Sequence, residues 1–98
     1  MIKNKSIIKT DVVVIGGGPA GMMTAGRSGA GGVSVLLLEK NKTLGKKLLI
    51  TGGGRCNLAN NILDNRALLA KYKDSDQFLF SAFSQFGVKE TLQFFKDR

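Results

Sequence analysis

The feature that most constrains this chain is a glycine pattern, Gly16-x-Gly18-x-x-Gly21, that directly follows a run of four β-branched residues. The run, Val12–Ile15, is continuous rather than alternating, which is typical of a strand buried on both faces of a parallel sheet. Pro19 stands where the first residue of a helix would, because a missing N–H costs nothing there. The pattern therefore predicts a strand, a tight turn and a helix.

The residues around this pattern extend the prediction to a βαβ unit. Thr10–Ile15 is expected to be the first strand, Pro19–Ser28 the helix and Val33–Leu38 a second buried strand, after a glycine-rich break at 29–32. Crossovers of this kind are right-handed and join parallel strands. We therefore expect an α/β, Rossmann-like FAD/NAD(P)-binding βαβ unit followed by short helices, with an incomplete parallel sheet.

The rest of the chain predicts loops and helices rather than strands. Asn41–Asn61 is expected to be irregular, and 62–72 has only a weak helical pattern. Asp76–Phe86 reads as an amphipathic helix with Asp74 or Ser75 as its cap and Gly87 as its stop. Lys89–Lys96 is a further candidate helix. The helical spacing favours packing over nucleobase stacking for the phenylalanines of this half.

Each residue of the glycine pattern has a predicted task at a pyrophosphate. Gly16 permits the sharp turn out of the strand, Gly18 lets the backbone approach the phosphates, and Gly21 lets the helix pack close to the sheet. The helix that begins at Pro19 and Ala20 offers free N–H groups and its dipole to the anion. The alternative is that the glycine pattern forms an ordinary turn with no role in binding.

Glu39 ends the second predicted strand and follows the glycine pattern at the spacing of the acid that binds ribose hydroxyls. Its carboxylate would accept hydrogen bonds from an adenosine ribose and repel a 2′-phosphate. The ligand is therefore expected to be FAD or NAD rather than NADP. The alternative is a solvated acid at the end of a strand.

A second glycine segment, Thr51–Gly54 followed by Arg55, favours FAD over NAD. Consecutive backbone N–H groups can form an anion-binding nest, and the guanidinium adds a fixed charge with bidentate geometry. An extended FAD needs such contacts along its pyrophosphate and towards its flavin. The alternative is a flexible loop.

Three stretches together resemble the BaiN/YhiN-like flavoproteins, also described as aminoacetone-oxidase-family FAD-binding enzymes or NAD(P)/FAD-dependent oxidoreductases. They are 11–23 (DVVVIGGGPAGMM), 36–41 (LLLEKN) and 45–58 (GKKLLITGGGRCNL). The resemblance implies that Gly16, Gly18 and Gly21 line the pyrophosphate, that Glu39 holds the ribose, and that Gly52–Asn57 face the pyrophosphate and flavin. The residues predicted to bind the cofactor are Gly16, Gly18, Pro19, Ala20, Gly21, Glu39, Lys40, Lys47, Gly53, Gly54, Arg55 and Asn57.

Members of that family are considerably longer than 98 residues. Residues 1–98 are therefore expected to be the N-terminal part of an FAD-binding domain, with a substrate domain outside them. The helix at 19–28 is also richer in glycine than is usual for the family, which weakens it.

Charge and cysteine content narrow the function classes. The net charge is +8, and residues 1–60 hold nine basic and only two acidic residues. This balance suits an anionic ligand such as a pyrophosphate, a nucleic acid, or merely a soluble surface. Because there is no histidine and Cys56 is the single cysteine, a zinc site and histidine-based catalysis are excluded within this chain. Cys56 is read as a small side chain in a cofactor loop, with a redox role as the alternative.

The N-terminal residues contain no apolar stretch of signal-peptide or membrane-span length, so a cytoplasmic protein without membrane contact is expected. The leading functional hypothesis is a flavin-dependent oxidoreductase that binds FAD for hydride transfer, with NAD(P)H as a possible electron donor. The alternatives are a non-catalytic NAD- or FAD-binding fragment and a basic nucleic-acid-binding protein. No catalytic or metal-binding residue is assigned, no nucleic-acid partner is expected, and the substrate and oligomeric state stay open.

Overall fold

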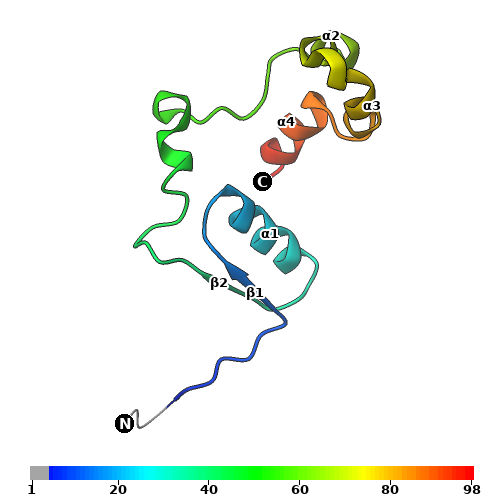
Figure 1. Ribbon diagram of the computed structural model, residues 1–98. Coiled ribbons are helices and arrows are strands. Elements are labelled where there is room, and N and C mark those ends of the chain that lie inside the picture. Colours follow the sequence, from blue (N-terminus) through cyan, green and yellow to red (C-terminus); the bar gives the residue numbers. More distant parts are fainter. Residues whose placement is uncertain (1–4) are drawn as a thin grey trace. The chain divides into compact units, whose positions relative to one another are not determined.

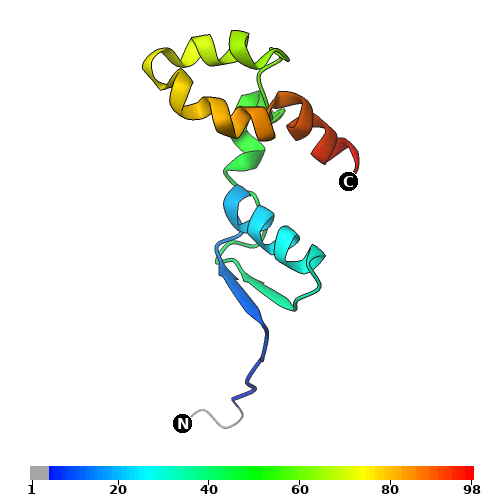
Figure 2. The same cartoon turned by 90° about the vertical axis from the view of Figure 1, so that its right-hand side faces the viewer.

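The computed structural model describes residues 5–98, which form two compact units, one up to Cys56 and the other from Asn57 to Arg98. The first unit contains strand β1 (Val12–Ile15), helix α1 (Pro19–Ala30) and strand β2 (Val35–Leu38). The two strands are parallel and pair in register, with Val12 opposite Val35 and Ile15 opposite Leu38. Helix α1 connects them and lies along the sheet (Figures 1 and 2). The predicted α/β, Rossmann-like βαβ unit is confirmed.

One face of the sheet is exposed, as the predicted incomplete sheet implies. Val14 is buried beneath α1, whereas Val13 and Ile15 are exposed, Ile15 at 85%, and Leu38 is exposed as well. The continuous apolar runs are typical of strands covered on both faces, but two strands are too few for that, and within residues 5–98 a helix covers only one face. Both strands are also shorter at their N-terminal ends than predicted. Val33 and Ser34 precede β2, and Asp11 accepts hydrogen bonds from the backbone and hydroxyl of Ser34 instead of extending β1.

Helix α1 begins at Pro19 as predicted and continues two residues beyond the predicted Ser28. Gly29 is therefore helical, although glycine is a poor helix former. The helix ends where the N–H of Gly31 donates to the carbonyls of Arg27 and Ser28, and Gly32 then takes a φ of +89°. A left-handed residue of this kind is a common way to end a helix.

The segment predicted to be irregular contains one ordered element. Leu48–Gly54 forms the 3₁₀ segment η1, which is kinked at Thr51. The hydroxyl of Thr51 donates to the carbonyl of Leu48 at 2.7 Å, and the N–H of Cys56 donates back to the carbonyl of Thr51. Local hydrogen bonds that composition does not reveal therefore shape this loop.

The second unit is helical, with α2 (Asn65–Leu69), the 3₁₀ segment η2 (Ala70–Ser75), α3 (Asp76–Gln85) and α4 (Val88–Lys96). Its buried hydrophobic residues are Leu68, Leu69 and Val88. The Asp64 carboxylate caps α2 by accepting from the N–H of Ala67. The weak helical pattern of 62–72 thus corresponds to one short α-helix and a 3₁₀ segment, while the two later helices lie close to their predicted bounds.

Ser75 occupies the N-cap position of α3, as predicted, but neither it nor Asp74 makes a capping hydrogen bond there. The helix ends at Gln85, one residue before the predicted Phe86. The phenylalanines contribute less to the core than their spacing predicts, since Phe78 is 86% exposed. Within residues 5–98, no helix has the length and apolar character needed to cross a lipid bilayer.

Candidate functional site

The turn after β1 is built by a glycine in a conformation that few other residues adopt. Gly16 has a φ of +102°, and its N–H donates to the carbonyl of Leu38 at 2.8 Å. The bond extends the strand pairing by one residue while the chain reverses direction towards α1. The left-handed region at this φ favours glycine because it has no Cβ. The structure thus provides the turn predicted for Gly16.

Gly21, in the first turn of α1, lies against the backbone of the turn between β1 and α1. We call this turn, Gly16–Gly18, the glycine turn. A Cβ at Gly21 would lie 1.8 Å from the carbonyl oxygen of Gly16 and 3.5 Å from the side chain of Val14. The first distance is far inside van der Waals contact. The close packing of helix on strand that the glycine pattern predicts is therefore present, and it requires a glycine.

Gly18 differs from both of these residues. It is the N-cap of α1 with φ −79° and ψ −173°, an extended conformation open to any residue, and a Cβ there would meet nothing within 4 Å. Within residues 5–98, no side chain caps α1 and no acidic residue lies in its first turn. Pro19 and Ala20 are exposed at this helix end. Open space, uncapped helical N–H groups and the positive end of the helix dipole fit an anionic phosphate group.

Glu39 joins the end of β2 to the glycine turn. One carboxylate oxygen accepts from the N–H of Gly17 at 3.0 Å, and the other accepts from the N–H of Asn41. These backbone hydrogen bonds, Asn41 first and Gly17 second, lower the pKa of Glu39 below its ordinary value of 4.5, and the charge of Lys40 adds to the effect. The carboxylate is therefore ionised at neutral pH, as a ribose-binding acid must be.

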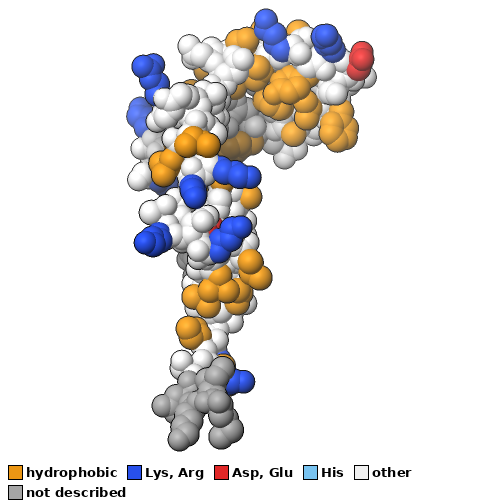
Figure 3. Space-filling model, turned by 60° about the vertical axis from the view of Figure 1, so that its left-hand side comes forward, with side chains coloured by type: hydrophobic (Ala, Val, Ile, Leu, Met, Phe, Trp, Pro, Cys, Tyr) orange, Lys and Arg blue, Asp and Glu red, His pale blue; other side chains and the backbone are white. Residues whose placement is uncertain are grey.

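The basic side chains predicted to assist are at the surface of the first unit. Lys40 directly follows Glu39, and Lys47 is the N-cap of η1. Both are exposed. Figure 3 shows Lys and Arg side chains projecting from the surface among exposed hydrophobic ones, with few acidic side chains in view. The positive electrostatic potential of these side chains attracts anions to the first unit.

The second glycine segment is open. Gly52, Gly53 and Gly54 have φ values of +58°, +63° and +88°, and Cys56 has a φ of +61°. A Cβ on Gly53 or Gly54 would meet nothing within 4 Å. The N–H groups of Arg55 and Cys56 are used locally, since they donate to the carbonyls of Gly52 and Thr51. The structure thus gives all three glycines a conformational reason to be glycine, and it gives Gly53 and Gly54 no packing reason.

The structure brings only some of the predicted residues together. Gly16, Gly18, Pro19, Ala20, Gly21 and Glu39 surround one turn, and Lys40 adjoins it in the chain. Among residues 5–98, no hydrogen bond joins Gly53, Gly54 or Arg55 to that turn. Asn57 is the first residue of the second unit. The predicted roles of all these residues in binding stay predictions.

Two residues with close contacts at the site were missed by the sequence reasoning. Gly17 fills the variable position of the glycine pattern and is buried, and Gly45 is buried with a φ of +67°. The N–H of Gly45 donates to the carbonyl of Gly17 at 2.7 Å. The unbroken run Gly16–Gly18 was a signal for the first of them, because a third consecutive glycine exceeds what the pattern needs.

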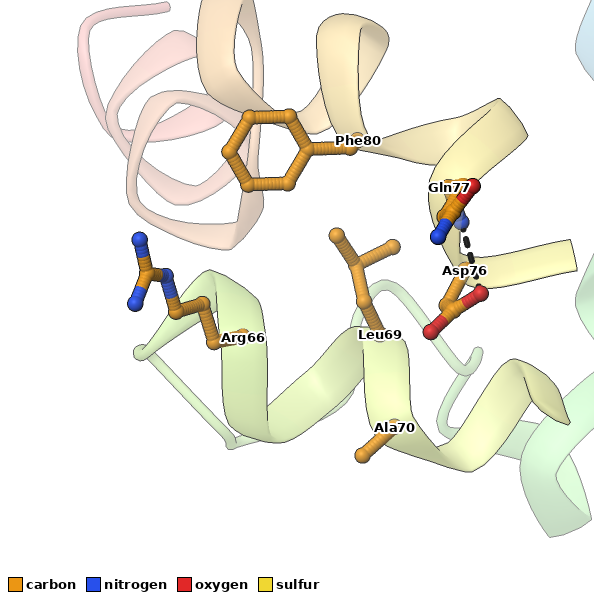
Figure 4. A pocket seen from close by; sticks show the side chains of 6 residues that line it. All are labelled: Arg66, Leu69, Ala70, Asp76, Gln77 and Phe80. Carbon is orange, nitrogen blue, oxygen red and sulfur yellow. Dashed lines mark hydrogen bonds between the residues drawn. The ribbon is translucent and has the colours of Figure 1, made fainter.

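The second unit carries a separate pocket of about 340 Å³. Leu69 and Phe80 supply its apolar walls, with Arg66 and Asp76 at its edge and Ala70 and Gln77 completing the lining (Figure 4). The Asp76 carboxylate is engaged by the N–H of Gln77. No predicted cofactor-binding residue lines this pocket. Across residues 5–98, no three His, Cys, Asp or Glu side chains gather as metal ligands would.

Comparison with known proteins identifies relatives that match most of the chain, including the βαβ unit. A family model described as the HI0933-like protein Rossmann domain matches residues 10–98. A 3-dehydro-bile acid delta(4,6)-reductase of Clostridium scindens is 38% identical over 84 residues, which is 84% of this chain and 20% of that protein. A ribosomal RNA dihydrouridine synthase of Escherichia coli is 38% identical over 76 residues, or 78% of this chain and 18% of that protein.

A shorter match, 52% identical over 40 residues, is to a ferredoxin–NADP reductase of Bacillus pumilus and covers 41% of this chain and 12% of that protein. The chain thus spans about a fifth of the length of the first two relatives. These matches confirm the predicted family resemblance and support a nucleotide or flavin cofactor.

Proposed function

The chain belongs to the family of HI0933-like protein Rossmann domains, and on that premise we propose that it is the FAD-binding segment of a flavin-dependent oxidoreductase. FAD, when bound, would supply the hydride-transfer chemistry. Residues 1–98 would supply binding and orientation as the N-terminal part of the FAD-binding domain. A cytoplasmic location and NAD(P)H as the electron donor belong to the same proposal.

The single observation that carries this proposal concerns Gly18. The folded chain requires a glycine at Gly16 because of its φ and at Gly21 because of its contact with the turn. Neither reason applies to Gly18, where a side chain would fit both the backbone conformation and the surrounding space. A ligand explains this glycine, because a pyrophosphate that approaches the backbone needs the volume a Cβ would occupy.

Glu39 supports a dinucleotide with a free ribose. Each of its carboxylate oxygens accepts one backbone hydrogen bond and has a further lone pair for a hydroxyl donor. A 2′-phosphate would bring a second negative charge to the same place. FAD or NAD is therefore favoured over NADP, and the open, basic segment from Gly53 to Arg55 favours FAD as the longer ligand. The names of the matched relatives, a reductase and a dihydrouridine synthase, support an oxidoreductase but differ in substrate.

Calorimetric titration of the chain with FAD, ADP, NAD⁺ and NADP⁺ tests the proposal. We expect FAD to bind best and NADP⁺ least, and Glu39→Ala to weaken FAD binding by about 10- to 150-fold through loss of hydrogen bonds to a charged acceptor. A matched control is Glu90→Ala, which removes a carboxylate from the second unit. FAD binding no better than NADP⁺ binding would contradict the role of Glu39, and no binding of any dinucleotide would contradict the proposal.

A further inference from the structure

Gly17 is held on three sides by the segment that follows β2. Its N–H donates to Glu39, and its carbonyl accepts from the N–H of Gly45 at 2.7 Å. A Cβ on Gly17 would lie 2.4 Å from Cδ2 of Leu44 and 3.2 Å from Cβ of Glu39. Residues 39–45 therefore bind both the N–H and the carbonyl of Gly17 and occupy the space where its side chain would lie.

Gly45 continues this connection to the start of η1. Its carbonyl accepts from the N–H of Leu49 in η1 at 3.0 Å, and a Cβ on Gly45 would lie 3.1 Å from the Cε of Met22 in α1. Its φ of +67° lies in the left-handed region. Gly45 thus touches the glycine turn, helix α1 and the start of η1 at once, in a conformation that favours glycine.

We propose that Gly17, Glu39, Leu44 and Gly45 form a clip that positions the glycine turn for the dinucleotide and anchors the start of η1, ahead of the second glycine segment. Gly17 and Gly45 are positioning residues in this clip, since their own contacts are with the protein. This inference rests on the proposed function of the turn, and it assigns a task to residues outside the glycine fingerprint.

The physical reason is preorganisation. A glycine turn has more conformational freedom than any other backbone segment, and a ligand that must order it loses affinity to that ordering. Two hydrogen bonds and a close steric contact fix the turn before a ligand arrives. Glu39 then has two tasks, because it holds the turn with hydrogen bonds that leave lone pairs free for a ribose.

The test begins with Gly17→Ala, which forces Leu44 and Glu39 to move. We expect the variant to weaken FAD binding by about tenfold and to speed amide hydrogen exchange at Gly45 by about tenfold, because the turn is no longer held in place. Gly26→Ala is the matched control, since it makes the same change in α1 where a Cβ meets nothing within 4 Å. It should leave both quantities unchanged.

Rescue separates positioning from general damage. Leu44→Ala removes the atom nearest to the added methyl group, so the double variant Gly17→Ala, Leu44→Ala should recover most of the lost affinity and exchange protection. Unchanged binding and exchange in Gly17→Ala would overturn the proposal, because they would show that Leu44 simply rotates away. A double variant no better than Gly17→Ala would overturn it as well.

Hydrogen exchange of the unsubstituted chain keeps the proposal testable if Gly17→Ala fails to fold. The clip predicts that the amides of Gly17 and Gly45 exchange at least about tenfold more slowly than an unprotected amide of the same sequence, because their hydrogen bonds must open first. Exchange at the unprotected rate would overturn it. If the chain binds no FAD, the proposed function fails while the exchange data still judge the clip. If FAD binds normally to Gly17→Ala, the clip fails and the function stands.

Discussion

Gly16–Gly21 and Gly52–Gly54 contain four and three glycines, and the structure surrounds the two segments differently. In the first, Gly16 has a left-handed conformation, a Cβ on Gly21 would overlap the backbone of Gly16, and a Cβ on Gly17 would displace the side chain of Leu44. In the second, the glycines have left-handed φ values, and Gly53 and Gly54 have open space around them. Packing fixes the first segment, whereas backbone conformation alone accounts for the second.

This difference predicts that a ligand would bind the first segment in an already ordered conformation and the second segment in a less ordered one. The first segment is anchored by β1, β2 and α1, and we propose that its one glycine without a structural reason, Gly18, leaves space for a ligand. The second segment has local hydrogen bonds but no packed partner among residues 5–98. We expect FAD to find the first segment ordered and to contribute order to the second.

The largest effect is expected from Gly21→Ala, which would place a methyl group 1.8 Å from the carbonyl oxygen of Gly16. Helix α1 must then move off the turn, at a cost of about 3 kcal/mol or more by analogy with overpacked cores. Thermal unfolding followed by circular dichroism measures this loss. Gly26→Ala in the same helix should instead stabilise by up to about 1 kcal/mol. Equal unfolding temperatures for the two variants would show that the close contact does not matter.

Gly18→Val should separate binding from folding. The extended backbone and open space at Gly18 accept a branched side chain, so the unfolding temperature should stay close to that of the original chain. FAD binding should be lost, because the side chain fills the space assigned to the pyrophosphate. Gly26→Val, also in open space on α1, should bind FAD normally. Retained FAD affinity in Gly18→Val would remove the main support for the site.

A smaller effect is expected in the second segment. Gly53→Ala keeps open space but puts a Cβ on a residue with a φ of +63°, which costs about 1–2 kcal/mol of strain. Gly53→Asn should recover part of this loss, because asparagine tolerates the left-handed region. Chemical denaturation of the two variants measures the difference. A loss as large as that of Gly21→Ala would mean that the second segment is packed like the first.

The smallest effect concerns pH. Hydrogen bonds from Asn41 and Gly17 lower the pKa of Glu39 below 4.5, so its contribution to holding the turn is fully present above pH 4.5. The contribution is lost as pH falls through the lowered pKa, because the protonated acid is a poorer acceptor. The amide shift of Gly17, followed by nuclear magnetic resonance, should titrate with a midpoint below 4.5, and Glu39→Gln should abolish that step. A midpoint above 4.5 would contradict the hydrogen bonding seen here.

Local patterns predicted the fold of the first unit well, because the evidence for it is local. The β-branched run, Pro19 and the three spaced glycines each specify their own conformation. The exposed face of the sheet was predictable from the number of strands and not from the apolar run itself. A continuous apolar run such as Val12–Ile15 is typical of a strand buried on both faces, but two predicted strands are too few for a sheet covered on both faces.

The tertiary parts of the site escaped the sequence reasoning. No sequence pattern predicts the hydrogen bond between Gly17 and Gly45, because the two residues are far apart in the chain. Composition likewise could not show that a hydrogen bond from Cys56 to Thr51 closes a local loop at the end of η1. In the second unit, helical spacing located α3, but it overestimated the burial of Phe78, because spacing defines a face and not what covers it.

The open sheet face has a consequence for handling the chain. Val13, Ile15 and Leu38 expose apolar surface, and such patches promote association. We expect the 98-residue chain to self-associate at high concentration, as light scattering would show. Ile15→Lys, at the most exposed of these positions, should reduce association without changing the glycine turn, and unchanged scattering would place the contact elsewhere.

The most direct test of the central claim is a map of backbone amide shifts on titration of the chain with FAD, which works even at low affinity. The account predicts that the largest changes occur at Gly18, Ala20 and Gly21, with smaller changes at Gly53 and Gly54 and none in Gly18→Val. Changes confined to residues 57–98, around the pocket lined by Leu69 and Phe80, would show that the ligand binds elsewhere and would contradict the account.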